Sequence, residues 1–111
     1  MRITFKTRRL QKECSSEREM IRAFGQPCAA KLKRRLAVLE AAQSLADVPK
    51  QRPERCHALK ADRQGQFAVD VEHPFRLVFE PVDPGACTSD SGNIDESQVK
   101  AIRILAVEDY H

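Results

Sequence analysis

The sequence predicts an α+β domain in which an N-terminal strand and a helical hairpin pack on a small, largely antiparallel β-sheet. Three observations lead to this fold: a short alternating run at the N-terminus, apolar residues at helical spacings in the first half, and apolar residues at every other position in the second half. Because 111 residues is the size of an ordinary domain, we expect residues 1–111 to form one unit.

The N-terminal part contains signals for one strand and the start of the helical region. Ile3, Thr4 and Phe5 alternate between apolar and polar and predict the first strand. Helical spacing begins a few residues later, near residue 8. Ser16 followed by Glu19 has the form of a capping box, so a helix starts or restarts there. A glycine at position 25 fits the end of that helix.

The second helix of the hairpin is predicted by its apolar stripe. Pro27 suits a first turn, and the helix should reach about Ala42 or Ser44. The stripe repeats at spacings of three, four and three residues, through Ala29, Leu32, Leu36 and Leu39. The basic residues of this helix fall mostly off the stripe, and we expect them to be exposed: Lys31, Lys33, Arg34 and Arg35.

Beyond the helices the hydrophobic period changes to two. Residues 67–71 and 75–79 alternate and are joined by a tight connection, which predicts a β-hairpin. Residues 81–98 contain two prolines, two glycines and four acidic residues, and predict a flexible acidic loop. The apolar run 101–107 predicts a last strand over about residues 99–108.

The net charge of +3 conceals a strong asymmetry. Residues 1–63 carry 16 Lys and Arg against 7 Asp and Glu, whereas residues 64–111 carry 3 against 9. A basic half suits a phosphate-rich partner, and it equally suits a helical surface that needs charge for solubility. No apolar stretch approaches the ~20 residues that span a bilayer, and no secretory signal is visible. We therefore expect a soluble, cytoplasmic protein with no membrane partner.

The four cysteines give no sign of a metal site. They are widely and irregularly spaced, with no C-x-x-C pair, at Cys14, Cys28, Cys56 and Cys87. Without a secretory signal, reduced thiols are expected. We predict neither a bound metal nor a cofactor.

The chain finishes in three residues that can hold or move protons, Asp109, Tyr110 and His111, and a second histidine, His57, lies upstream. Cleavage of an RNA phosphodiester can use the 2′-hydroxyl as nucleophile, so the protein must remove one proton, supply another and offset charge on the phosphorane. Imidazoles, with a pKa of ~6.5, suit both proton transfers. Fixed cations suit the third task, arginine above all.

Three cations accompany these groups: Lys60, Arg63 and Arg76. Arg76 is flanked by apolar strand residues, so its side chain points to the opposite face, which stays open if the helices cover the apolar one. On the last strand the sequence alternation puts Glu108 and Tyr110 on one face and Asp109 and His111 on the other.

Each candidate also has an ordinary structural role open to it. A single histidine is more often structural than catalytic. Arg76 could be a cross-strand partner of Asp70, Tyr110 could pack at the sheet edge, and Asp109 could cap a turn. The joint presence of these groups is what favours catalysis.

Three segments together resemble the RelE/ParE superfamily of bacterial toxins, most closely the HigB (host-inhibition-of-growth) branch. They are residues 57–67 (HALKADRQGQF), residues 75–79 (FRLVF) and the terminal Asp-Tyr-His. The basic helical hairpin agrees, so the resemblance covers nearly the whole chain. Two features depart from the family: Ala61 stands where these toxins commonly have glycine, and residues 81–98 are long for a hairpin loop.

The resemblance implies a RelE-like fold and the toxin of a type II toxin–antitoxin system, a ribosome-dependent mRNA endonuclease held inactive by a helix-turn-helix, HigA-like antitoxin. By matching motif positions, the catalytic set would be His57, Asp109, Tyr110 and His111. Arg76 would hold the scissile phosphate, and Lys60 and Arg63 would make further RNA contacts. The basic helix would face ribosomal RNA through Lys31, Lys33, Arg34 and Arg35.

Two other functions remain open at this point. A ParE-like toxin would share the fold and inhibit DNA gyrase without cutting RNA, because fold alone does not fix activity. A non-toxic relative would bind RNA with strong salt dependence and leave transcripts intact. The feature that favours the nuclease is the combination of His57 with the terminal trio, which a gyrase inhibitor does not need.

Overall fold

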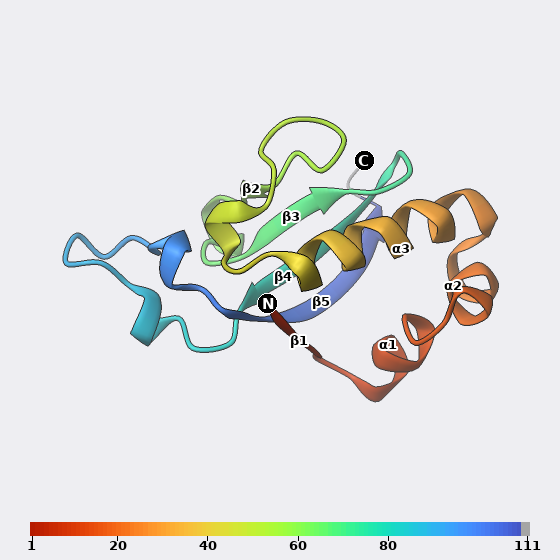
Figure 1. Cartoon of the computed structure of the whole chain (residues 1–111), viewed down its shortest axis with the longest axis horizontal. Coiled ribbons are helices and arrows are strands. Elements are labelled where there is room, and N and C mark those ends of the chain that lie inside the picture. Colours follow the sequence, from red (N-terminus) through yellow and green to blue (C-terminus); the bar gives the residue numbers. More distant parts are fainter. Residues whose placement is uncertain (110–111) are drawn as a thin grey trace.

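Residues 1–109, which the computed structural model describes, form three α-helices and one five-stranded sheet (Figure 1). The strands are β1 (Arg2–Phe5), β2 (His57–Ala58), β3 (Phe67–Asp70), β4 (Phe75–Pro81) and β5 (Ala101–Asp109). Their order across the sheet is β1-β5-β4-β3-β2, and among these pairs β1 and β5 alone run parallel. The α+β fold with a largely antiparallel sheet is therefore confirmed. The short edge strand β2 was not predicted, since two residues are too few to show a period.

The helices are α1 (Arg8–Glu13), α2 (Glu17–Phe24) and α3 (Gln26–Ala41). The Ser16 hydroxyl accepts a hydrogen bond of 3.2 Å from the backbone N–H of Glu19, which confirms the predicted helix start. Gly25 has a φ of 86°, so it can end α2 and let α3 begin at the next residue. Pro27 lies in the first turn of α3, as expected. The short 3₁₀ helices are η1 (Leu45–Asp47), η2 (Ala61–Arg63), η3 (Gly85–Cys87) and η4 (Glu96–Gln98).

The buried face of α3 differs from the prediction at one important position. Arg35 was expected to be exposed, and this was wrong: the residue is only 5% exposed. It lies three residues after Leu32 and four before Leu39, on the buried side of the helix. Its Nε donates a 2.7 Å hydrogen bond to the backbone carbonyl of Asp70 at the end of β3. Burial of this cation is tolerated because its polar group is bonded while its stem packs in the core.

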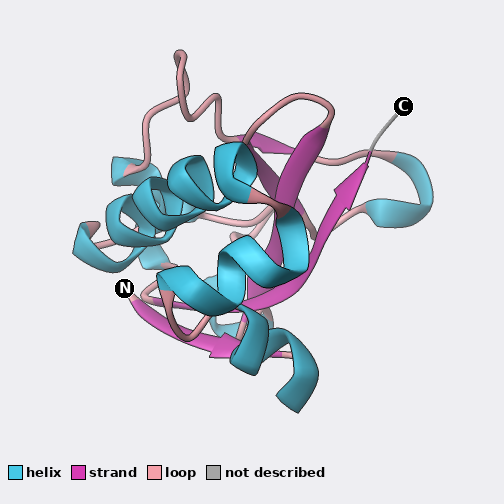
Figure 2. Cartoon of the chain, turned by 90° about the vertical axis from the view of Figure 1, so that its right-hand side faces the viewer, coloured by secondary structure: helices cyan, strands magenta, loops and turns pink. Residues whose placement is uncertain are grey.

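The core lies between α3 and one face of the sheet, called here the covered face. Leu32 and Leu39 of α3 cluster with fully buried strand residues, namely Leu77, Phe79, Ile102 and Ile104. The rings of Phe67 and Phe79 stack with centroids 6.1 Å apart. Figure 2 shows α3 on one side of the strands. The core therefore lies where the helical region packs on the sheet, as the sequence predicted.

The opposite side of the sheet, the open face, carries a small second cluster. It consists of Ala68, Val78 and Leu59, with Leu105 packed against them. Leu105 follows Ile104 of the covered face, and it is the extra residue of β5 where the register between β4 and β5 shifts at Val78/Phe79. The cluster is too small to stabilise the fold alone, so this face is available for polar groups.

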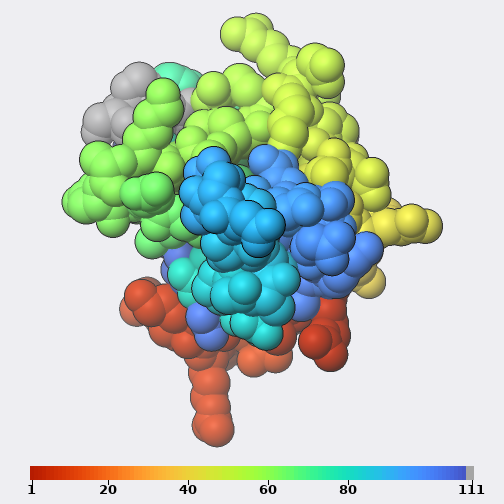
Figure 3. Space-filling model, turned by 90° about the vertical axis from the view of Figure 1, so that its left-hand side faces the viewer, coloured from red at the N-terminus to blue at the C-terminus, as the bar shows by residue number. Residues whose placement is uncertain are grey.

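The acidic segment 81–98 leaves the sheet at the end of β4 and returns at the start of β5. It contains η3 and η4, and a bridge joins Thr88 and Ile94. Glu96 pairs with Lys50 near its base, and Cys87 is buried there. Figure 3 shows the segment in cyan and blue between the N-terminal residues and residues 50–66. Its flexibility stays a prediction.

The four cysteines are free and buried: Cys14, Cys28, Cys56 and Cys87. Burial raises the pKa of both the Cys14 and the Cys56 thiol to about 11. Between residues 1 and 109 no helix is both long enough and apolar enough to span a bilayer.

Candidate functional site: a charged row on the open face

The strand register aligns charged side chains across the open face. Arg76 on β4 lies opposite Asp70 on β3 and opposite Glu108 on β5. Residues directly opposite one another in antiparallel strands point to the same face. Leu77, next to Arg76, packs with the core on the covered face. Arg76 therefore belongs to the open face, as the sequence predicted.

Glu108 holds two arginines together. Arg63, from η2, donates from both terminal nitrogens to the two Glu108 oxygens, at 2.7 and 3.1 Å. Arg76 donates a 3.1 Å bond to Oε2 of the same carboxylate. The hydrogen bond from Arg63, and then that from Arg76, lower the pKa of Glu108 although partial burial opposes this. The same bond raises the pKa of Arg63. Glu108 is thus held ionised between two cations.

A second pair extends this alignment towards β2. Arg55 donates from Nε and from a terminal nitrogen to the two Asp70 oxygens, at 2.7 and 3.0 Å. The result is a series of charges of alternating sign, which we call the charged row. It consists of Arg55, Asp70, Arg76, Glu108 and Arg63. Three cations and two carboxylates leave the row with a net positive charge.

His57 lies beside the charged row. It pairs with Ala68 on β3, two residues from Asp70, so its side chain shares the open face. The ring is half-buried, and its Nδ1 lies 2.7 Å from the backbone carbonyl oxygen of Arg55. Strands β2 and β4 are two positions apart, which places His57 and Arg76 on backbones ~10 Å from one another. Long side chains can close such a gap.

Lys60 stands at the rim of this face. It is exposed, immediately precedes η2, and lines a hollow together with Leu59 and with Asn93 of the acidic segment. The next residue, Ala61, has a φ of 59°. This is the left-handed conformation in which glycine is usual, so the turn keeps its shape although alanine occupies it.

Asp109 lies at the end of β5 on the other side of the sheet. It pairs with Phe75, one residue from the Arg76–Glu108 pair, and therefore points away from the open face. Tyr110 and His111 lie outside the described residues. Among the predicted site residues, the structure thus puts His57, Arg63 and Arg76 on the open face, with Arg63 and Arg76 joined through Glu108. Lys60 lies next to η2, in the hollow beside the acidic segment. In the part of the chain that the structure describes, no group of three or more His, Cys, Asp or Glu residues is arranged to hold a metal ion.

Three residues of this arrangement were not predicted as site residues: Glu108, Asp70 and Arg55. Strand alternation had placed Glu108 on one face of the last strand, and Asp70 had been considered only as a partner for Arg76. For Glu108 the missing information was the register between β4 and β5. No period in the sequence carries it, because a bulge shifts it.

The other basic residues of α3, Lys31, Lys33 and Arg34, belong to the helix that packs on the covered face, and two of them form ion pairs. Lys31 contacts Glu72 at 2.6 Å and Lys33 contacts Glu17 at 2.9 Å. The hydrogen bond from Lys33 lowers the pKa of Glu17. Arg34 is exposed. Exposed pairs of this kind exchange readily for other anions, because water and salt screen the attraction between their charges.

No family model and no curated sequence matches this chain. Among solved structures it is similar to the YoeB–YefM complex from Staphylococcus aureus. The TM-score is 0.55 at 15% identity, and the alignment covers 100% of this chain and 97% of that chain. At this identity the likeness shows a shared fold. The RelE-like architecture expected from the sequence is thereby confirmed.

Proposed function

We propose that the chain is the toxin of a type II toxin–antitoxin system, of the HigB-like branch, and that it cuts messenger RNA on the ribosome. The observation that carries this proposal is the placement of His57, Arg63 and Arg76 on one open sheet face. The structural neighbour supports it, because YoeB–YefM is a RelE/YoeB-type toxin–antitoxin complex. The resemblance of residues 57–67, 75–79 and 109–111 supports the finer assignment.

The cleavage uses the RNA's own 2′-hydroxyl. One histidine removes its proton, the 2′-oxygen bonds to phosphorus, and the bond from phosphorus to the 5′-oxygen breaks. A second histidine gives that oxygen a proton, which leaves a 2′,3′-cyclic phosphate and a 5′-hydroxyl. His57 and His111 are the proposed histidines. Tyr110 is the third proposed member. Asp109, which the sequence placed in this set, points away from the open face and is left out of it.

Arg63 and Arg76 offset the charge that grows on the phosphorane. The fork of Arg63 already binds two oxygens of one anion, the Glu108 carboxylate, at 2.7 and 3.1 Å. A phosphate offers an equivalent pair of oxygens. RNA therefore competes with Glu108 for these guanidinium groups, and Lys60 at the rim provides a further contact.

The basic side of α3 supplies the proposed ribosome contact through Lys31, Lys33 and Arg34. Arg35 is not part of this surface because it is buried against β3. The proposed protein partner is a helix-turn-helix, HigA-like antitoxin. The neighbouring structure, which holds YoeB together with YefM, supports a partner of the antitoxin class.

The test is expression of the chain alone in bacteria, with mapping of RNA ends on translating ribosomes. We expect growth arrest and new message ends within the decoding site. His57→Ala, His111→Ala and removal of residues 109–111 should each relieve the arrest. His73→Ala is the matched control, since His73 lies in the β3–β4 connection and has no proposed role; it should stay toxic.

Two outcomes would contradict the proposal. Full toxicity after removal of residues 109–111 would exclude the terminal trio as catalyst. Arrested growth with intact messages and inhibited gyrase would indicate a ParE-like toxin instead.

A further inference from the structure

We propose that Asp70 and Arg55 are positioning residues that orient His57 so that its Nε2 is the nitrogen that exchanges protons with RNA. The inference rests on the proposed nuclease and deepens it by naming the reacting atom and the residues that aim it. The contacts on which it rests are four hydrogen bonds between α3, the loop before β2, and the end of β3.

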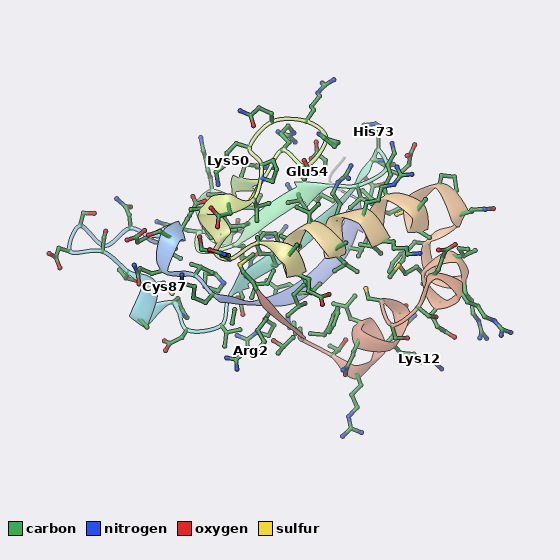
Figure 4. The ribbon with its side chains drawn as sticks, in the orientation of Figure 1. Arg2, Lys12, Lys50, Glu54, His73 and Cys87 are labelled. Carbon is green, nitrogen blue, oxygen red and sulfur yellow. The ribbon has the colours of Figure 1, made fainter. Side chains whose placement is uncertain are left out.

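Asp70 fixes the loop before β2 through both its backbone and its side chain. Its N–H donates to the Glu54 carbonyl at 2.8 Å, and its carboxylate accepts both bonds from Arg55. Figure 4 labels Glu54 on this loop, beside β3. Asp70 is itself held from the core side, because buried Arg35 donates to its carbonyl at 2.7 Å. The loop is therefore tied to α3, the helix that packs on the core.

Arg55 has an unusual backbone conformation that these bonds maintain. Its φ is 47°, in the left-handed region that residues with side chains rarely adopt. A residue held there by its surroundings is a reason to look for a function. The Arg55 N–H donates to the Gln51 carbonyl at 2.8 Å while the side chain is clamped by Asp70. This conformation sets the direction of the Arg55 carbonyl, which meets the His57 ring.

The contact between Arg55 and His57 determines which ring nitrogen can react. A carbonyl oxygen can only accept, so the 2.7 Å contact requires that Nδ1 of His57 carry the proton. In the neutral ring the lone pair is then on Nε2. A proton removed from the 2′-hydroxyl, or given to the 5′-oxygen, must pass through that atom.

The test is the tautomer of His57, read from the ¹⁵N shifts of labelled histidine in the full chain, with His73 as internal reference. We expect the proton on Nδ1 in the unaltered chain. Asp70→Asn and Arg55→Gln should each shift the ring towards the Nε2–H form. Each should also lower kcat for message cleavage by about 10- to 100-fold with little change in KM, because small errors of orientation slow catalysis steeply.

The two variants break the same ion pair between Arg55 and Asp70, one by changing the cation and the other by changing the carboxylate. Arg55→Gln leaves Asp70 in place opposite Arg76, so an effect shared by both variants belongs to the Asp70–Arg55 pair. Asp70→Glu keeps a carboxylate and should recover part of the rate. Glu80→Gln is the matched control: it removes an open-face carboxylate bonded to Arg103, a pair with no link to His57, and should change neither tautomer nor kcat.

Three results would overturn the inference: an Nε2–H tautomer in the unaltered chain, a tautomer unchanged by both variants, or rate losses that follow only the fraction of unfolded protein. Failure of the nuclease itself is distinguishable, because the tautomer is measured without RNA. A chain that cuts no message would refute the proposed function, and the ¹⁵N shifts would still decide whether Asp70 and Arg55 orient the ring.

Discussion

The two faces of the sheet carry opposite kinds of side chain. On the covered face, Leu77, Phe79, Ile102 and Ile104 are fully buried against α3. On the open face the strand residues Asp70, Arg76 and Glu108 form the middle of the charged row, and Arg55 and Arg63 join it from outside the strands. Apolar burial provides most of the favourable free energy of folding, whereas partly exposed ion pairs add little. Stability therefore resides mainly on the covered face, which leaves the open face available for polar and charged side chains.

The largest effect should come from emptying the covered face. Phe79 is fully buried and stacks on Phe67, so Phe79→Ala should lower the free energy of unfolding by ~3–5 kcal/mol. Urea denaturation followed by circular dichroism measures this. Val82→Ala, just beyond the same strand and 38% exposed, is the control and should stay within ~0.5 kcal/mol. Equal losses in both variants would mean that the core does not lie where the structure puts it.

In the charged row we expect an effect of intermediate size, from a substitution that lowers stability and raises affinity for RNA. Glu108→Gln leaves Arg63 and Arg76 without their shared carboxylate, and should cost ~1–3 kcal/mol of stability. The same change should tighten binding of single-stranded RNA, since two guanidinium groups no longer share a competing anion. Fluorescence anisotropy measures this, with a steeper salt dependence than in the unaltered chain.

Glu80→Gln tests whether the effect depends on the charged row, because Glu80 is a carboxylate of the open face outside that row. Its partner Arg103 has a side chain that is 42% exposed, so we expect a loss below ~1 kcal/mol and unchanged RNA binding. If Glu80→Gln and Glu108→Gln both bind RNA more tightly than the unaltered chain, and by the same factor, the effect comes from overall charge and the charged row has no special role.

The pH dependence of stability also tests the contribution of Glu108. Arg63 first, and then Arg76, lower the pKa of Glu108 below its ordinary 4.5 in the folded chain. The folded state therefore favours the ionised form, whose stabilisation is complete above pH 4.5 and is lost as the pH falls through the lower folded pKa. The stability difference between the unaltered chain and Glu108→Gln should be constant near neutrality and shrink in acid. A difference that grows in acid would have the wrong sign for this assignment.

Much of the covered face could be predicted from sequence because burial leaves a period. The spacing of Leu32 and Leu39, and the alternation through Leu77 and Phe79, gave the helix, the hairpin and the side on which they meet. Arg35 broke the rule. A cation next to the apolar stripe is expected to be exposed unless a buried acceptor for it is known. For Arg35 that acceptor is a backbone carbonyl 35 residues away.

The open face could be predicted only in part. Alternation was enough to place Arg76 there, and the resemblance pointed to His57 and Arg63. The partners that set their charge and orientation, Glu108 and Asp70, depend on strand register and on a loop conformation. Neither is a local property of the chain, because a one-residue change of register moves every side chain to the other face.

The smallest effect is expected at the rim of the open face, where the turn before β3 holds Ala61 at a φ of 59°. Ala61→Gly should raise the free energy of unfolding by ~0.5–1 kcal/mol, since relief of the left-handed strain exceeds the added freedom of the unfolded chain. Ala58→Gly is the matched control: the same change within β2, an extended strand, should lower stability by a similar amount. Changes of opposite sign in the free energy of unfolding, measured by urea denaturation, would show that the backbone is strained at Ala61 and relaxed at Ala58. Equal destabilisation by both would show that Ala61 is relaxed and that the turn does not need glycine.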